Sequence, residues 1–533
     1  MRSFTISLFI LLLLDINLLY SQTWPKYYGQ ANRIDRPWDL IETYDKGYLI
    51  LGNYPEFSWL IKTDINGNIL WEKIIDNEPN PLGTSVSIEA ASDGGVLVCG
   101  IALSGYSNKY CPFVMKLDAC GEKEWCKIFE GSPNDSPWAQ DIKETVSGDI
   151  VVLVTQYGSI PEETIHLFKL TADGEVIWKE AYATTFDYPN TNTKIGKSLL
   201  INSNNEYLIS GDAYWAQPWN PGGAMPLTPL FIMVGSDGTE EWVLPFGLND
   251  TIIGRAFSAT EVENGLFIGM AHDWGASLIP LFAEFDQSGQ ETDFRLLHSQ
   301  NMDPDLTSGT LTKMYNFDSK HYAQGTFIYE PDQSIPVTVV ELENDIFGLD
   351  TIVSNSVIHH GHFSPSSFTK TFDNKLLSNS TITTSSVNKD ISLAKLNLNL
   401  EFDTAYTGNY TYDSLCIPGP PQNGFIYLDN CDIITSIEMP SAAEYRAKIS
   451  HIPIRIFPNP ANAQITFVLE NTEHHHNIEL RCFNMLGMQQ HQVVLPRGQQ
   501  QATTNVSNWP QGMYIAVVYS NGKPVGKGKF VVR

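Results

Sequence analysis

A short apolar pattern that recurs about every fifty residues most constrains the fold of this chain. In each copy an apolar run leads into a tight turn with a glycine, and a second run carries a tryptophan four residues after that glycine. Recurrence at such a period indicates a repeat architecture rather than one compact core. The complete glycine–tryptophan pairs are Gly67/Trp71, Gly121/Trp125, Gly174/Trp178 and Gly238/Trp242.

A second unit precedes each copy and extends the repeat to seven members. It is a strand, a short polar turn and a strand rich in β-branched and aromatic residues, for example residues 40–53 and 88–100. Seven such four-stranded units predict an all-β chain with a seven-bladed β-propeller over residues 23–406. Corresponding turn positions, 51 to 64 residues apart, are Asp64, Asp118, Thr171, Gly235, Asp286, Glu343 and Asn397.

The segment 23–28 resembles the fourth strand of a repeat without its first three, because Trp24-Pro25-Lys26 matches Trp71-Glu72-Lys73. We expect it to pair with the last repeat and to close the ring, since a propeller leaves no free sheet edge between its first and last blades. Residues 400–406 compete for the same outermost position, and the sequence leaves this choice open.

The net charge and the N-terminal segment indicate which partners and which cellular compartment to expect. The net charge of −27 excludes a nucleic-acid or anionic-membrane surface, which needs an excess of Lys and Arg. Residues 1–21 are typical of a secretory signal peptide: Arg2 is followed by an apolar run over 4–14 that is too short to span a bilayer comfortably. We expect no membrane span in the mature chain.

Residues 451–533 differ in charge from the rest, with seven basic and three acidic residues. They alternate polar and apolar residues in strand pairs, which predicts a separate small β-sandwich. The motifs at 457–467, 484–493 and 506–533 resemble the type A sorting domain of the Bacteroidetes type IX secretion system. The residues that carry this resemblance are Pro458, Asn459, Pro460, Gly487, Gly512 and Tyr514.

The resemblance implies a route and a partner rather than an activity. It implies export through the periplasm, contact with the type IX secretion machinery, and release from the cell or attachment to its surface. Residues 436–450 are expected to be the linker before this domain.

Export makes the seven cysteines candidates for disulfides. Local spacing suggests three pairings: Cys120 with Cys126 across a hairpin, Cys99 with Cys111 on successive strands, and Cys416 with Cys431 around a Pro/Gly-rich loop. The alternative is that some of these cysteines are buried thiols. The last pair would staple residues 407–435 into an extension of the propeller. Cys482 is left over.

The long connections between repeat strands are expected on one face of the ring, where loops can bind ligands. Adjacent aromatics there could form a platform for a glycan or protein ligand, or fold back to cover blade edges. The alternative function is a secreted hydrolase or lyase acting on polysaccharide or peptide at the same face. The proposed patch is Tyr214, Trp215, Trp219, His272 and Trp274.

Other candidate motifs favour structural roles. Residues 64–68 have part of a calcium-loop spacing but lack its closing carboxylate, so a hairpin turn is favoured. His359, His360 and His362, like the run 474–476, lack nearby ligands at metal spacing. No Ser-His-Asp set, phosphate-binding glycine loop or HExxH motif occurs in the sequence. We therefore expect no cofactor and no metal, and a binding module rather than an enzyme.

Overall fold

The computed structural model describes residues 24–533 with internal gaps, and the chain divides into two units, Met1–Met439 and Pro440–Arg533. The predicted signal peptide, most of the predicted linker and Gly487 lie outside the described residues. The gaps are 55–56, 77–83, 105–108, 131–135, 158–163, 183–193, 215–226, 247–251, 263–264, 274–277, 299–304, 318–319, 333, 343–345, 348–352, 360–366, 385–387, 417–422, 429, 436–440, 442–451, 453, 470–471, 473–476, 486–487, 497 and 521–522.

In the first unit the described residues form seven antiparallel sheets of four strands, two of which gain a fifth strand. The prediction of an all-β chain is confirmed, and no described helix is long and apolar enough to cross a membrane. The first three sheets are β2(Arg36–Glu42), β3(Tyr48–Tyr54), β4(Phe57–Thr63), β5(Ile69–Asp76); β6(Thr84–Ala90), β7(Val96–Leu103), β8(Tyr110–Leu117), β9(Lys123–Glu130); and β10(Ser136–Glu144), β11(Ile150–Tyr157), β12(Thr164–Leu170), β13(Val176–Tyr182). The others are β14(Lys194–Ile201), β15(Tyr207–Tyr214), β16(Leu227–Val234), β17(Glu240–Pro245); β18(Gly254–Glu261), β19(Phe267–Asp273), β20(Ile279–Phe285), β21(Glu291–Leu296); β22(Leu306–Phe317), β23(Lys320–Tyr329), β24(Val337–Leu342), β25(Val353–His359); and β26(Phe368–Lys370), β27(Leu376–Thr383), β28(Lys389–Leu396), β1(Lys26–Tyr28).

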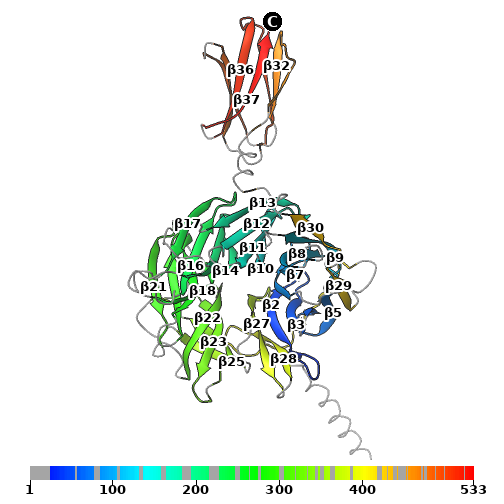
Figure 1. Cartoon of the computed structure of the whole chain (residues 1–533), viewed down its shortest axis with the longest axis vertical. Coiled ribbons are helices and arrows are strands. Elements are labelled where there is room, and N and C mark those ends of the chain that lie inside the picture. The colour runs from blue at the N-terminus through cyan, green and yellow to red at the C-terminus, as the bar shows by residue number, and fades with distance from the viewer. Residues whose placement is uncertain are drawn as a thin grey trace, which may run out of the picture. The chain divides into compact units, whose positions relative to one another are not determined.

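Figure 1 shows these sheets following one another in chain order around a common centre, with β2, β10, β14, β18 and β22 innermost. Hydrophobic clusters join neighbouring sheets. Leu51 and Trp71 of the first sheet, for example, pack in one cluster with Val98 and Phe113 of the second. Each sheet therefore buries its faces against its two neighbours and depends on them for its core.

The N-terminal strand β1 belongs to the seventh sheet, where it pairs antiparallel with β28. The N-terminal segment, rather than 400–406, thus forms the outermost strand of that sheet. Trp24 and Tyr28 also share a hydrophobic cluster with Tyr48 and Trp59 of the first sheet. The first described residues of the chain therefore connect its last sheet to its first.

The repeated tryptophan packs against the turn glycine of the next sheet. A Cβ on Gly121 would lie 2.7 Å from the Trp71 ring, and one on Gly174 would lie 2.9 Å from the Trp125 ring. Trp125 Nε1 also donates to the carbonyl of Ala172 in that turn at 3.1 Å. The glycine–tryptophan repeat therefore encodes a contact between sheets, and Trp24 makes the same contact with Gly67 of the first sheet.

A buried lysine supports the first turn of several sheets. In the first sheet Lys62 of β4 donates to both carboxylate oxygens of Asp45, at 2.9 and 3.0 Å. The same pairing of a third-strand lysine with an aspartate of the first turn joins Lys116 to Asp93, Lys169 to Asp149 and Lys395 to Asp373. These pairs tie the third strand to the first turn within a sheet.

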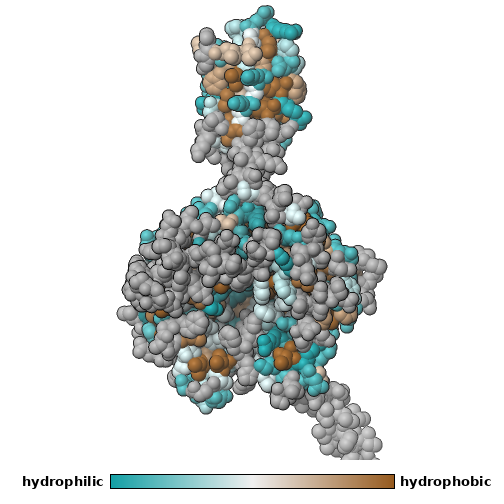
Figure 2. Space-filling model, in the orientation of Figure 1, coloured by the Kyte–Doolittle hydropathy of each residue, from teal (hydrophilic) through white to brown (hydrophobic). Residues whose placement is uncertain are grey.

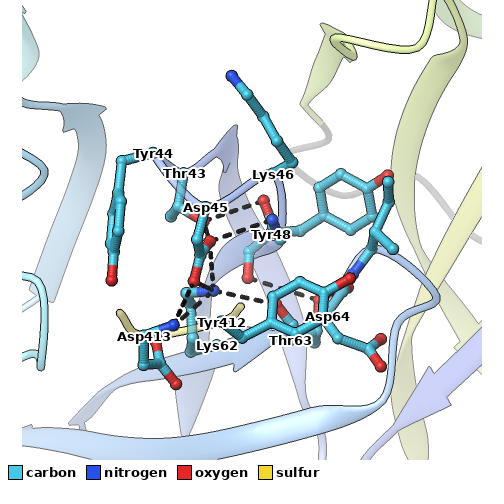
Figure 3. Close-up of polar contacts among 12 residues, drawn as sticks. Thr43, Tyr44, Asp45, Lys46, Tyr48, Lys62, Thr63, Asp64, Tyr412 and Asp413 are labelled. Atoms are coloured by element: carbon cyan, nitrogen blue, oxygen red, sulfur yellow. Dashed lines mark hydrogen bonds and ion pairs between the residues drawn. The ribbon is translucent and has the colours of Figure 1, made fainter. Parts of the chain in front are cut away.

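The chain that follows the seventh sheet returns to the first two sheets. Tyr406 N donates to Asn66 Oδ1 at 2.7 Å, and Asp413 N donates to Asp45 Oδ2 at 2.9 Å. In Figure 3, Asp45, Tyr412 and Asp413 surround the ammonium group of Lys62, while Lys46 points away from it. We call residues 402–435 the strap.

The strap then adds two parallel strands to sheet edges. β29(Gly424–Tyr427) pairs with β5, and β30(Asp432–Thr435) pairs with β9.

The expected disulfide pairings are wrong: the bonds join Cys120 to Cys416 and Cys126 to Cys431. Cys99, Cys111 and Cys482 are buried and take no part in these two bonds. Local spacing misled the pairing because the strap brings together cysteines 296 and 305 residues apart.

The second unit contains two sheets around one hydrophobic core, which includes Phe467, Leu480 and Tyr514. On the face drawn in Figure 2, hydrophobic residues lie among hydrophilic ones. The strands are β31(Ile454–Phe457), β32(Gln464–Leu469) and β35(Gln501–Asn505) in one sheet, and β34(Gln489–Leu495), β33(Ile478–Asn484), β36(Gly512–Ser520) and β37(Lys523–Val532) in the other.

The contact between Trp71 and Gly121 predicts an unequal effect of two similar substitutions. Gly121 and Gly148 both have positive φ, 73° and 83°, but a Cβ meets Trp71 at Gly121 and nothing within 4 Å at Gly148. Gly121→Ala should therefore cost roughly 1–3 kcal/mol more than Gly148→Ala, because the alanine displaces the indole. Denaturant unfolding of both variants measures the difference. Equal losses would contradict the packing role.

Candidate functional site

The innermost strands share a β-bulge at equivalent positions, and the bulges shape the centre of the first unit. The register of β2 against β3 shifts between Pro37 and Asp39, which leaves Trp38 as the extra residue. A bulge re-aims a side chain and interrupts strand pairing. The extra residues in the first six sheets are Trp38, Val86, Gln140, Lys197, Phe257 and Thr312.

Carboxylates that follow two of these bulges connect neighbouring sheets. Asp39 accepts hydrogen bonds from Ile88 N of the second sheet at 3.0 Å and from Ser367 Oγ, next to the seventh sheet, at 2.8 Å. Asp141 accepts from Leu199 N of the fourth sheet at 2.8 Å. Ser87 Oγ lies 3.0 Å from both carboxylates. These bonds satisfy polar groups that would otherwise be buried without partners.

A cavity of about 600 Å³ lies at the centre, lined by residues from or adjoining the innermost strands of all seven sheets. Among the described residues of its wall, acidic and lysine side chains are equal in number, whereas the whole chain has 60 acidic and 33 basic residues. The centre is therefore less acidic than the protein as a whole. The charged lining residues are Asp39, Glu42, Glu89, Asp141, Lys143, Lys197, Lys313 and Lys370.

Glu89 and Lys143 form the central ion pair of the cavity wall. Lys143 Nζ lies 2.9 Å from Glu89 Oε2, 3.1 Å from Asp141 Oδ1 and 3.0 Å from the Ile142 carbonyl, so the ammonium has three acceptors. Burial raises the pKa of Glu89, although Lys143 opposes the shift. Water still reaches 29% of the Glu89 side chain, so this carboxylate could exchange a proton with a ligand.

A second charged group joins the fourth and fifth sheets. Lys197 Nζ lies 2.5 Å from Asp212 Oδ1 and above the Phe257 ring, at 4.9 Å from its centre. Burial lowers the pKa of Lys197 and raises the pKa of Asp212, so both shift toward their neutral forms. The Phe257 ring also contacts His272, with ring centres 5.1 Å apart. Two adjacent bulges thus place a lysine and an aromatic ring side by side.

The predicted aromatic patch is described only in part. His272 is 5% exposed and lies against Phe257, so it is part of the protein interior. Trp215, Trp219 and Trp274 lie outside the described residues, as does the side chain of Tyr214. A ligand site at this patch stays a prediction.

Sequence reasoning missed the central charged residues. Glu89 and Lys143 stand two residues after Ser87 and Asp141, which themselves follow bulges. The repeat could have aligned the innermost strands, but a bulge shifts every later side chain by one position. Without the bulge positions, the sequence does not tell which side chains face the centre.

Among the described residues, no group of three or more His, Cys, Asp or Glu side chains could hold a metal ion. Residues 64–68 form a hairpin turn, in which Gly67 N donates to the Asp64 carbonyl and Asn66 N to Asp64 Oδ1. The side chain of His359 and the histidines at 360, 362 and 474–476 lie outside the described part of the chain.

In the second unit the sequence motifs meet at the last strand. Asn459 Oδ1 accepts from Val531 N at 3.0 Å, so the Pro458–Pro460 motif is fixed to β37. Tyr514 stacks on Phe530 and donates to the Pro510 carbonyl at 2.7 Å. Residues 455–533 match the family model of the secretion system C-terminal sorting domain. This segment is a type IX sorting domain.

A sorting domain of this kind implies export and a place at the cell surface or in the medium. It also implies that the type IX machinery is a partner. No curated protein sequence matches the chain.

Several solved structures are similar to this chain at low identity. A polysaccharide lyase described as an ulvan lyase has TM-score 0.46 and 10% identity, with 69% of this chain and 94% of that chain covered. Virginiamycin B lyase from Staphylococcus aureus has TM-score 0.43 and 12% identity, with 70% and 99% covered. A protein of unknown function from Dyadobacter fermentans has TM-score 0.43 and 10% identity, with 61% and 96% covered.

The environment of His272 predicts acid sensitivity. Burial, with help from Lys197 and Arg255, lowers the pKa of His272 from 6.5 to about 4. Between these values the unfolded chain binds a proton that the folded chain does not, so stability falls as the pH falls through this window. The loss amounts to at most about 3 kcal/mol.

His272→Gln removes this titration, so its stability should fall less between pH 7 and pH 4.5 than that of the wild type. Denaturant unfolding at the two pH values gives both differences. If the two proteins lose the same free energy, His272 does not stay neutral in the folded state.

Proposed function

We propose that this protein is an exported binding module: a seven-bladed β-propeller over residues 23–406 that binds a glycan or protein at the cell surface or in the medium. The sorting domain over 451–533 is proposed to be a small β-sandwich that directs type IX secretion. The strap and its two disulfides are proposed to hold the first two blades together.

Two observations support the propeller. The seven sheets contact one another in sequence, and each hydrophobic cluster of the first unit draws on neighbouring sheets. Trp71 of the first sheet contacts Gly121 of the second. Trp24, next to β1 of the seventh sheet, makes the same contact with Gly67 of the first sheet. Among the described residues this contact occurs at four junctions, including the one that joins the last sheet to the first, as a closed circle of sheets requires.

One observation carries the binding proposal. The carboxylates at the middle of the cavity are already committed to bonds between sheets: Asp39 to Ile88 and Ser367, and Asp141 to Leu199 and Lys143. A general base needs a lone pair that is available to the substrate. Asp39 and Asp141 therefore serve the framework, and the cavity and loops around them are better suited to binding than to catalysis.

Glu89 favours the alternative, a secreted hydrolase or lyase acting on polysaccharide or peptide. One of its oxygens is bonded to Lys143, and the other makes no hydrogen bond among the described residues. A partly exposed carboxylate with a raised pKa in a cavity is a candidate acid or base. Lys313, which also lines the cavity, is near enough to lower the pKa of Glu89.

Arrays of glycans and peptides, probed with the labelled full chain, test the two functions together. We expect a retained ligand, no new chain ends when that ligand is incubated with the protein, and binding within about twofold of wild type for Glu89→Gln. New reducing or unsaturated ends that the wild type produces and Glu89→Gln does not would favour the enzyme and contradict the binding module.

A further inference from the structure

The outer edge of the first sheet carries a pair of exposed aromatic side chains. Phe425 and Tyr427 of β29 are 56% and 43% exposed, while Ile426 between them is buried in the core. The two rings are stacked, with centres 6.0 Å apart and planes 17° apart. Alternation along the strand places both rings on one face, pointing out of the protein. The two exposed rings are therefore neighbours with nearly parallel planes.

The strand that carries this pair is fixed on both sides. Cys416 bonds to Cys120 before β29, and Cys431 bonds to Cys126 after it. β29 also pairs with β5 over four residues, and Leu428 N donates to the Asp76 carbonyl at 3.0 Å. The backbone under the two rings is therefore held by covalent and hydrogen bonds to the first two sheets (Figure 1).

A fixed aromatic pair is suited to binding. Single exposed hydrophobic side chains are common and need no explanation, but an ordered pair offers a contiguous apolar surface. Because the strand is already immobile, a ligand that stacks on the rings orders few additional groups, and little affinity is lost to entropy. The disulfides that bracket the strand supply this rigidity.

We propose that Phe425 and Tyr427 form a stacking platform for a chain of neutral sugars. The C–H face of a pyranose ring packs on an aromatic ring, and two rings side by side can engage consecutive sugars. This proposal rests on the proposed binding function and adds a ligand class and a site away from the central cavity.

The overall charge of the chain favours neutral rather than acidic sugars at the platform. The carboxylates beside it are paired with lysines, Glu122 with Lys73 and Asp432 with Lys127. Lys123 Nζ donates to the Tyr427 carbonyl. With a net charge of −27 on the chain, a carboxylated or sulfated polysaccharide would meet repulsion on approach.

The test measures binding of cellohexaose, xylohexaose and hexa-N-acetylchitohexaose to the full chain by calorimetry, with polygalacturonate as the acidic probe. We expect the wild type to bind at least one neutral oligosaccharide more tightly than the acidic probe. The double variant Phe425→Ala/Tyr427→Ala should weaken that binding by about tenfold or more, with an unchanged melting temperature.

Two matched variants control the result. Tyr427→Phe keeps the ring and should bind within about twofold of wild type. Phe294→Ala removes an exposed aromatic ring of β21 in the fifth sheet, 37% exposed, and should also leave binding unchanged.

Three results would overturn the platform. The first is a double variant that binds the neutral oligosaccharide as tightly as the wild type does. The platform would then be wrong, while the proposed binding function would stand if ligands found on the arrays still bind. The second is a wild type that binds none of the neutral oligosaccharides. The third is a dimer in light scattering that the double variant converts to monomer, since the rings would then contact a second copy of the chain.

Discussion

The contact between a tryptophan of one sheet and a turn glycine of the next is the interaction on which the first unit depends. A four-stranded sheet in this chain has apolar residues on both faces, so it is stable only between neighbours. Trp71 covers Gly121, Trp125 covers Gly174 and Trp242 covers Gly289, each at a glycine with positive φ. The glycine leaves room for the indole, and its φ permits the tight turn.

A polar layer near the centre complements this apolar contact. Bulges in the innermost strands interrupt the regular ladder, and Asp39 and Asp141 bond to backbone N–H groups of the neighbouring sheet. Asp39 and Asp141 therefore link neighbouring sheets. The residue type at the bulge varies from sheet to sheet, as Lys197 and Phe257 show. Side chains at these positions can therefore change the cavity wall without breaking the bonds of the polar layer.

The sequence predicted those features that repeat and missed those that depend on tertiary position. The spacing of Gly67 and Trp71 identified the repeat. Trp24 made the N-terminal segment a candidate for its missing strand, but the choice between this segment and residues 400–406 was settled only by the pairing of β1 with β28. The disulfides were mispaired because Cys416 and Cys431 are close in sequence, whereas the strap carries each to a different partner in the second sheet. The position of Glu89 in the cavity wall could not be inferred, since it depends on a bulge that no residue type in β6 marks.

The claim that the end of the first unit returns to its beginning can be tested by mapping the disulfides. Digestion of the non-reduced protein, followed by mass spectrometry, identifies the linked peptides. The account predicts peptides that join Cys120 to Cys416 and Cys126 to Cys431, and no peptide that joins Cys99 or Cys111 to the strap. Peptides that join Cys416 to Cys431, or Cys120 to Cys126, would contradict it, because the strap would then not be bonded to the second sheet.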